Sequence, residues 1–195
     1  MLGALTSMQH RQPRSAARLG RGLTLVELMV SLAIVAVLAA IAVPALRDYV
    51  ARKRVEGTAQ ELVTDLRWLR TLRIQRNETV GIRFGGNSSS TCYVIYALGG
   101  ESGVCDCTRS TGVCPSDMPE LKTVQLPRSN GVSVSATPGG LAVSRYNLPI
   151  GGTTLRVTVA SPNGGSVLVT TNAALMPDLC SVSGPESTLK PCPAP

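Results

Sequence analysis

The 195-residue sequence contains a single histidine, His10, which lies close to the N-terminus. If the leading segment is removed, the mature chain has no imidazole at all. That excludes Ser-His-Asp and Cys-His catalysis, and it excludes zinc sites that use histidine ligands. We therefore expect a protein that is not an enzyme and that has no cofactor or bound metal.

Aromatic residues are also scarce, with one Trp, one Phe and four Tyr in the whole chain. A platform for single-stranded nucleic acid stacks bases on several aromatic side chains among basic residues. This composition does not provide such a platform. Gly and Pro are scattered without a period, and the apolar content of 44% is too high for a disordered chain.

Acidic residues are absent from the first 22 positions, where four of the 19 basic residues lie: Arg11, Arg14, Arg18 and Arg21. The remainder carries 15 basic and 12 acidic residues, so much of the net charge of +7 belongs to the N-terminal segment. A short basic segment ahead of an apolar run is typical of targeting rather than of nucleic-acid binding.

Residues 23–46 form a long apolar run that contains one charged residue, Glu27, and one proline, Pro44. A helix that rises 1.5 Å per residue crosses a hydrocarbon core of about 30 Å in about 20 residues. The run is therefore long enough to span a membrane. An ionisable residue in such a segment is costly, so Glu27 is a candidate functional residue.

Arg21 and Gly22 precede the run, which begins Leu23-Thr-Leu-Val-Glu27. This arrangement resembles the type IV prepilin signature, in which a basic leader ends in Gly. The resemblance implies cleavage by a membrane prepilin peptidase between Gly22 and Leu23, and N-methylation of Leu23. Residues 1–22 would be the leader, or 15 residues if translation starts at Met8.

The same resemblance implies how the mature chain assembles. Glu27 would be the fifth mature residue, and its carboxylate would pair with the N-terminal ammonium of a neighbouring subunit and set the axial register. Pro44 lies where many pilins have a helix-kinking proline. The implied partners are other pilin or pseudopilin subunits, the peptidase, the inner-membrane assembly platform and the membrane itself.

A competing interpretation concerns Ala40-Ile41-Ala42, which resembles the A-x-A cleavage site of a secretory signal peptide. Residues 1–42 would then be removed. The apolar run is longer than the roughly 7–15 residues of an ordinary h-region, and it contains Glu27. Both features favour the prepilin interpretation.

Apolar residues recur at intervals of three and four after the anchor, and this spacing predicts an amphipathic helix over 47–76 that continues from the apolar run. The stripe consists of Val55, Ala59, Leu62, Leu66 and Leu69. Arg52, Lys53 and Arg54 read as a cluster that faces solvent and headgroups. Arg67, Arg70, Arg73 and Arg76 drift around the helix, and Arg73 falls on the apolar stripe.

The region 79–175 reads as short strands separated by Gly, Pro and Asn, which predicts a meandering antiparallel sheet. Expected strands cover residues 79–84, 92–97, 122–126, 132–136, 141–144, 154–159 and 166–170. The expected fold class is therefore α+β and type IV pilin-like, with a long N-terminal transmembrane helix packed by its C-terminal half on the sheet.

The helix from Leu62 to Asn77, followed by Glu78-Thr79-Val80, resembles the GspH/FimT family of minor pilins and pseudopilins. This resemblance implies a subunit of a type II secretion pseudopilus or of a type IV pilus. Some FimT-like proteins bind DNA through a basic C-terminal segment, so a DNA-binding minor pilin for natural transformation is the alternative. Here residues 161–180 contain no Lys or Arg, which argues against it.

Six cysteines lie between residues 92 and 192, and an even number after a targeting segment predicts export and disulfides. Cys114 is expected to close a small loop with Cys107 or with Cys105, and the other of these two to reach Cys92. Cys180 and Cys192 are expected to pair within a Cys- and Pro-rich tail, 176–195. A metal site built from the first four cysteines is disfavoured because no C-x-x-C pair is present.

Asp106 and Asp117 are the loop acids that would suggest calcium, but no EF-hand pattern surrounds them. The expected organisation is thus a leader, 1–22, an anchor helix, 23–46, and a globular domain, 47–195. We expect a single pass through the bacterial inner membrane, with the globular domain in the periplasm, followed by incorporation into the filament.

Overall fold

The computed structural model describes residues 24–98, 104–144, 149–150, 154–172, 176–183 and 189–192. The expected leader, including Gly22, and the expected first mature residue, Leu23, lie outside the described residues. The chain divides into two compact units, Met1–Ala42 and Val43–Pro195.

Helix α1 runs over Leu25–Arg76, a length of 52 residues, with Pro44 and Gly57 inside it. At its start the backbone N–H of Glu27 donates to Oγ1 of Thr24 at 3.2 Å, so Thr24 caps the first turn. At its end Asn77 adopts a left-handed conformation, with φ of 52°. Such a residue closes many helices, and the predicted end at residue 76 is confirmed.

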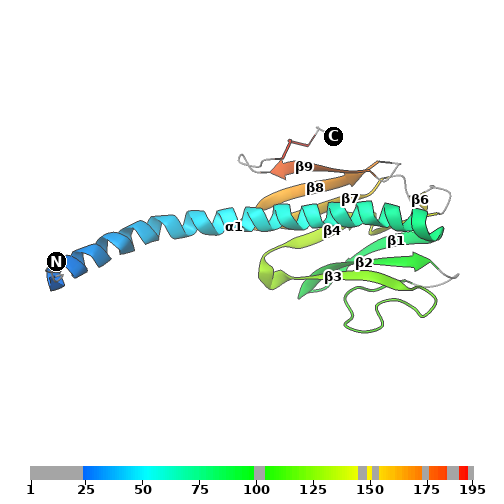
Figure 1. Ribbon diagram of the computed structural model, residues 1–195, viewed down its shortest axis with the longest axis horizontal. Coiled ribbons are helices and arrows are strands. Elements are labelled where there is room, and N and C mark those ends of the chain that lie inside the picture. Colours follow the sequence, from blue (N-terminus) through cyan, green and yellow to red (C-terminus); the bar gives the residue numbers. More distant parts are fainter. Residues whose placement is uncertain are drawn as a thin grey trace, which may run out of the picture. The chain divides into compact units, whose positions relative to one another are not determined.

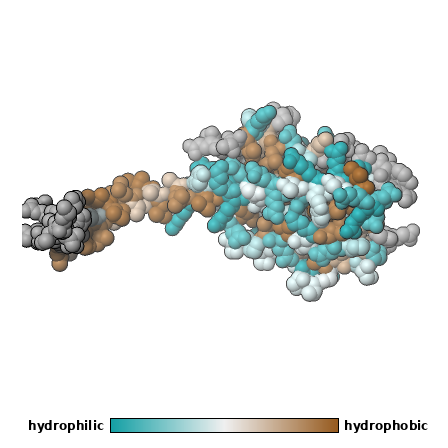
Figure 2. Space-filling view, viewed as in Figure 1, coloured by the Kyte–Doolittle hydropathy of each residue, from teal (hydrophilic) through white to brown (hydrophobic). Residues whose placement is uncertain are grey.

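The part of α1 in the first unit is apolar apart from Glu27 and Ser31, and Figure 2 shows the brown surface along it. An 18-residue window of α1 is long and apolar enough to cross a membrane, and none of that window is buried. A helix that is hydrophobic all round requires lipid or other protein around it.

The second unit contains two antiparallel sheets, not the single meander that the strand spacing predicted. The five-stranded sheet has the order β3-β2-β1-β5-β6 and comprises Thr79–Gly86 (β1), Ser90–Leu98 (β2), Glu120–Pro127 (β3), Gly140–Val143 (β5) and Pro149–Ile150 (β6). The four-stranded sheet has the order β4-β7-β8-β9 and comprises Ser133–Thr137 (β4), Arg156–Ser161 (β7), Gly165–Thr171 (β8) and Pro177–Ser183 (β9). A short 3-10 turn, Arg128–Asn130, joins β3 to β4.

The meander breaks because β4 pairs with β7 while β5 returns to pair with β1. Neighbouring runs along the chain therefore join different sheets. The helix lies over both sheets, with β1–β3 on one side of its axis and β7–β9 on the other in Figure 1. Strand β9 corrects the prediction for residues 176–195, which were expected to form only a Cys- and Pro-rich tail.

The predicted apolar stripe of the helix is buried and packs against both sheets in one core. The stripe residues are at most 2% exposed, and all of them belong to this core: Val55, Ala59, Leu62, Leu66 and Leu69. The sheets contribute Ile82, Ile95, Val157 and Val169, among others. A smaller cluster lies around Cys92, Val94 and Met118.

Candidate processing and assembly site

The candidate assembly residue Glu27 lies in the first turn of α1. Ser31 donates its hydroxyl hydrogen to the Glu27 carbonyl oxygen at 2.7 Å, one turn along the helix. A carboxylate in the first turn is favourable because the N-terminal end of the helix dipole is positive. Glu27 is thus an acid held on an otherwise apolar surface, close to the start of a helix.

Pro44 lies inside the helix at the boundary where the second unit begins. Proline has no backbone N–H and cannot donate to the carbonyl four residues earlier. The helix continues to Arg76 nevertheless. Pro44 is therefore a local weak point in a helix that is stabilised further on by packing.

A polar network that sequence reasoning missed joins the second half of α1 to the five-stranded sheet. Asp65 is 5% exposed, and its carboxylate accepts a hydrogen bond from the Tyr93 hydroxyl at 2.7 Å. Nζ of Lys122 lies 2.7 Å from both carboxylate oxygens. The only sequence signal was an acid at a position flanked by the buried residues Leu62 and Leu66.

This network shifts two pKa values in the same direction. Burial, followed by the hydrogen bond to Asp65, raises the pKa of Tyr93. Burial alone would lower the pKa of Lys122, but the hydrogen bond and the charge of Asp65, with Glu61 nearby, raise it overall. Lys122 therefore stays charged, and Tyr93 stays protonated, at physiological pH.

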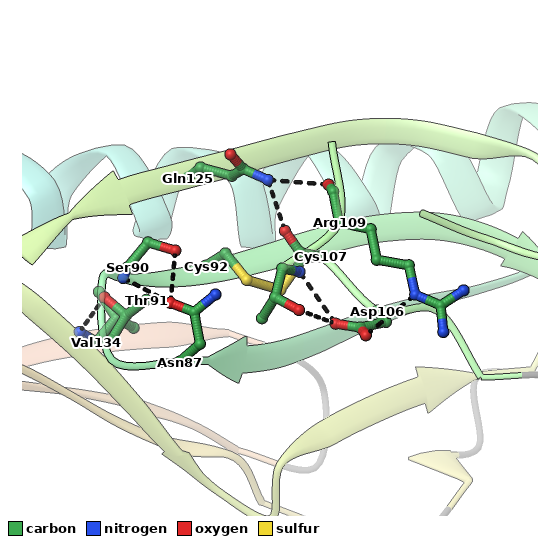
Figure 3. The surroundings of a disulfide bond; sticks show 10 residues. Asn87, Ser90, Thr91, Cys92, Asp106, Cys107, Arg109, Gln125 and Val134 are labelled. Atoms are coloured by element: carbon green, nitrogen blue, oxygen red, sulfur yellow. Dashed lines mark hydrogen bonds and ion pairs between the residues drawn. A yellow bond between two sulfur atoms is a disulfide. The ribbon is translucent and has the colours of Figure 1, made fainter. Parts of the chain in front are cut away.

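The loop after β2 is held by two disulfides, Cys92–Cys107 and Cys105–Cys114. This is one of the two arrangements that the spacing left open. In Figure 3, Nε2 of Gln125 on β3 donates to the carbonyl oxygens of Cys107 at 2.8 Å and of Arg109 at 3.1 Å. The loop is thereby fastened to the edge of the sheet.

The carboxylate of Asp106, the candidate calcium ligand, is engaged by residues of its own loop. Its carboxylate accepts hydrogen bonds from the hydroxyl and the backbone N–H of Thr108, which lower its pKa. Arg109 lies 3.4 Å from the other carboxylate oxygen. Within the described ranges, no group of three or more His, Cys, Asp or Glu residues is arranged to hold a metal ion.

The third disulfide, Cys180–Cys192, fastens the C-terminal segment to strand β9. The Ser181 N–H donates to the Lys190 carbonyl oxygen at 2.8 Å, and the Cys192 N–H donates to the Ser181 carbonyl oxygen at 3.1 Å. These bonds occupy part of the outer edge of β9. An edge that is covered in this way is protected from pairing with another chain.

The arginines in the last turns of α1 do not form one surface. Arg67 and Arg76 are exposed, whereas Arg73 is 9% exposed, as its place on the apolar stripe indicated. The Nε atom of Arg73 has no hydrogen-bond partner among the residues that the structure describes. Taken together, the described residues present an unburied apolar helical segment and a domain that is crosslinked by three disulfides.

Residues 18–43 match the family described as the prokaryotic N-terminal methylation motif. This segment includes Gly22, Leu23 and Glu27, the residues singled out for cleavage, methylation and subunit register. The match lies at the N-terminal end only and does not extend into the globular domain.

The chain is also similar to curated fimbrial proteins. It is 35% identical over 104 residues to the fimbrial protein EcpC of Eikenella corrodens, which covers 48% of this chain and 65% of that protein. It is 35% identical over 100 residues to the type IV major fimbrial protein FimA of Dichelobacter nodosus, which covers 51% of this chain and 61% of that protein. The chain thus spans less than two thirds of the length of these relatives.

Among solved structures, the type IV minor pilin FimU of Pseudomonas aeruginosa is similar with a TM-score of 0.47 and 14% identity, covering 70% of this chain and 96% of that one. The minor pseudopilin EpsH of the Vibrio cholerae type 2 secretion system has a TM-score of 0.44 and 13% identity, and the match covers 65% of this chain and 96% of that one. The chain carries the N-terminal methylation motif of prepilin-like proteins, and over about half of its length it is similar to type IV fimbrial proteins.

Proposed function

We propose that this chain is a minor pilin or pseudopilin of the GspH/FimT type. It is anchored in the inner membrane by α1, cleaved between Gly22 and Leu23, methylated on Leu23 and assembled into a filament. The observation that carries the proposal is the exposed apolar N-terminal part of α1, whose single acid, Glu27, lies near its start inside a matched methylation motif.

Membrane anchoring and filament assembly use the same apolar surface in two environments. In the bilayer, lipid covers the helix; in the filament, the helices of neighbouring subunits cover it. Glu27 is the exception on that surface, and pairing with a neighbour's N-terminal ammonium removes the cost of an isolated buried charge. The proposed role is structural, and the globular domain occupies the periplasmic side.

Intact mass and N-terminal sequencing of the protein from membranes, with and without prepilin peptidase, test the processing. A methylated Leu23 start that is lost without the peptidase supports the proposal. A start at Val43 would mean that Ala40-Ile41-Ala42 is cleaved as a signal peptide, and the filament role would then be rejected.

Substitution of Glu27 separates assembly from anchoring. Glu27→Gln keeps the size of the side chain and removes the charge that pairs with a neighbouring terminus. We expect normal cleavage and membrane insertion, but loss of incorporation into filaments, measured by co-purification with sheared filaments. Gln60→Glu, an exposed change within the globular domain, serves as a control for altered charge on the same helix.

The type of filament is tested in the host by deletion of the gene. Loss of a secreted protein from the medium indicates a secretion pseudopilus, and loss of surface fibres indicates a type IV pilus. The alternative role in DNA uptake predicts binding of duplex DNA that weakens steeply with salt. The absence of Lys and Arg from residues 161–180, which include β8, argues against that role.

A further inference from the structure

An open groove of about 540 Å³ lies along the first turns of α1 in the second unit. One wall consists of helix residues, of which Val43, Leu46 and Val50 are apolar and Arg47 and Arg54 are basic. The opposite wall consists of two polar turns, residues 129–131 after β3 and residues 161–163 after β7. The groove is therefore apolar on one side, polar on the other, and cationic.

The helical wall is a continuation of the stripe that forms the core. Its residues are spaced three and four apart, and the series runs on from Ala51 to Val55 and Ala59, which are buried under the sheets. Before Ala51 the stripe faces the groove instead of the sheets. The groove thus exposes apolar surface that no other described part of the domain covers.

Basic residues gather around this part of the helix. Arg47, Arg52, Lys53 and Arg54 lie within eight positions, and Asp48 is the only acid among those positions. Lys53 is paired with Glu56 at 2.7 Å. Nη1 of Arg54 donates to the Asn130 carbonyl oxygen at 3.3 Å, which holds the guanidinium at the rim of the groove.

This cluster contrasts with the usual distribution of charge around a membrane anchor. Lys and Arg normally concentrate on the cytoplasmic side of a transmembrane helix. In the proposed orientation the leader arginines lie on that side, whereas Arg47 and Arg54 follow the anchor on the other side. Cations placed there against this bias suit an anionic partner.

The position of the groove along the helix, relative to the bilayer, indicates which anionic partner it can meet. A hydrocarbon core of about 30 Å takes up about 20 residues from Leu23, which places its outer boundary near Val43. The headgroup layer then takes up roughly four or five further residues on that side, to about Arg47. Because side chains on a helix tilt toward its N-terminus, the Arg54 side chain also leans toward this layer.

We propose that the groove binds one anionic phospholipid of the inner membrane. Its phosphate pairs with Arg47 and Arg54, and its apolar part lies along Val43, Leu46 and Val50. The inference rests on the proposed function, because it requires the anchor to be inserted in the bilayer. Bound lipid would fix the height of the domain over the membrane before assembly.

The apolar helix of a second copy is the competing occupant, and the charges argue against it. Seating an apolar helix in the groove would remove two guanidinium groups from water without giving either a countercharge, and the described partner of Arg54 is the neutral Asn130 carbonyl oxygen. A phosphate supplies charge-assisted hydrogen bonds to both. The polar turn residues Ser129 and Ser161 suit a hydrated headgroup for the same reason.

The full chain in lipid nanodiscs tests the proposal. Photoreactive phosphatidylglycerol and photoreactive phosphatidylcholine, each with the reactive group close to the headgroup, are crosslinked, and the labelled peptides are mapped by mass spectrometry. We expect the anionic probe to label peptides containing residues 43–54 and 129–131 preferentially. Each arginine contributes about a fivefold preference, corresponding to about 1 kcal/mol per cation near an anionic surface.

The variant R47Q/R54Q is compared with R67Q/R76Q, which removes two exposed arginines from the same helix outside the groove. We expect the first pair to abolish the preference and the second to retain it. Equal labelling by the two probes, equal loss in both variants, or crosslinks to a second copy in place of lipid would each overturn the proposal. Failure of the wild-type chain to insert into nanodiscs would reject the proposed function as well, whereas insertion without a preference rejects the groove alone.

Discussion

Nζ of Lys122 lies 2.7 Å from both carboxylate oxygens of Asp65, and this ion pair joins edge strand β3 to the buried face of helix α1. The Tyr93 hydroxyl from the neighbouring strand β2 donates to the same carboxylate. A buried carboxylate is stable only when hydrogen bonds and a countercharge replace water. The three residues therefore add a polar link between the helix and this sheet to the apolar core that they share.

Removing the ammonium group should destabilise the domain. In Lys122→Met the stem of the side chain is kept, but Asp65 remains buried with only the tyrosine as a described side-chain partner. We expect a loss of about 1–3 kcal/mol in the free energy of unfolding, less than for a fully buried pair because Lys122 is about a third exposed. Denaturant unfolding in detergent measures the loss.

Lys53→Met provides the matched control, because Lys53 forms an ion pair of the same length with Glu56. That pair lies on the helix surface, where solvent screening leaves an ion pair with little net effect on stability, so the loss should be clearly smaller than for Lys122→Met. Equal effects of the two substitutions would show that burial of Asp65 does not matter to the strength of the Lys122 pair.

The same network predicts a loss of stability at alkaline pH. The pKa values of Tyr93 and Lys122 are both raised in the folded protein above ordinary values of 10.0 and 10.5. Between the unfolded and folded values the unfolded chain releases protons that the folded chain retains, so the unfolding free energy falls as pH rises. The contribution is complete below about pH 10 and is lost above it.

Melting temperatures measured from pH 8 to 11 check this dependence. The double variant Y93F/K122M removes both titrating groups, so its melting temperature should fall less over the same interval, even though it starts lower. If the wild type and the double variant decline in parallel, the alkaline loss originates elsewhere.

The helix and the methylation motif were predictable because their signals are local. The spacing of Val55, Leu62 and Leu69 defines the buried stripe, and Asn77 marks its end. The methylation motif is likewise a contiguous run around Glu27. A signal carried by neighbouring residues does not depend on how distant parts of the chain pair.

The division into two sheets was not predictable, because it depends on pairing between distant strands. Strands β4 and β5 are similar short runs, yet Val134 pairs with Val159 while Val143 pairs with Val80. The ion pair between Asp65 and Lys122 spans 57 residues and depends on the same packing. Strand β9 begins with Pro177 and lacks alternation, so its pairing with β8 defines it.

The turn between β7 and β8 touches the backbone of α1 at Gly164, and a substitution there should be destabilising. A Cβ atom on Gly164 would lie 2.7 Å from the carbonyl carbon and oxygen of Ala51. Because backbone atoms cannot rotate away, Gly164→Ala should shift the turn and cost about 1–3 kcal/mol. Thermal unfolding of the variant measures this cost.

Gly57→Ala is the control, since nothing lies within 4 Å of a Cβ atom at that position in the helix. Alanine favours the helix by about 1 kcal/mol over glycine, so this variant should be more stable than the wild type. The two glycine-to-alanine changes are expected to act in opposite directions. A stabilising effect of Gly164→Ala would show that the turn does not pack on the helix as the structure describes.

The disulfide Cys180–Cys192 should protect the edge of strand β9, and its removal should affect that edge more than the core. In C180A/C192A the segment Leu189–Cys192 is no longer tethered to the strand. The amides of Ser181 and residue 192 should then exchange with deuterium about tenfold faster or more, because local opening becomes easier. Their hydrogen bonds to Lys190 and Ser181 hold them in the wild type.

The Val169 amide in β8 reports on the core and should change less. The variant should also lose about 2–4 kcal/mol of overall stability if the crosslink restrains the unfolded chain. Unchanged exchange at Ser181 would instead show that the backbone bonds hold the segment without the disulfide, and the crosslink would then act on the unfolded chain alone.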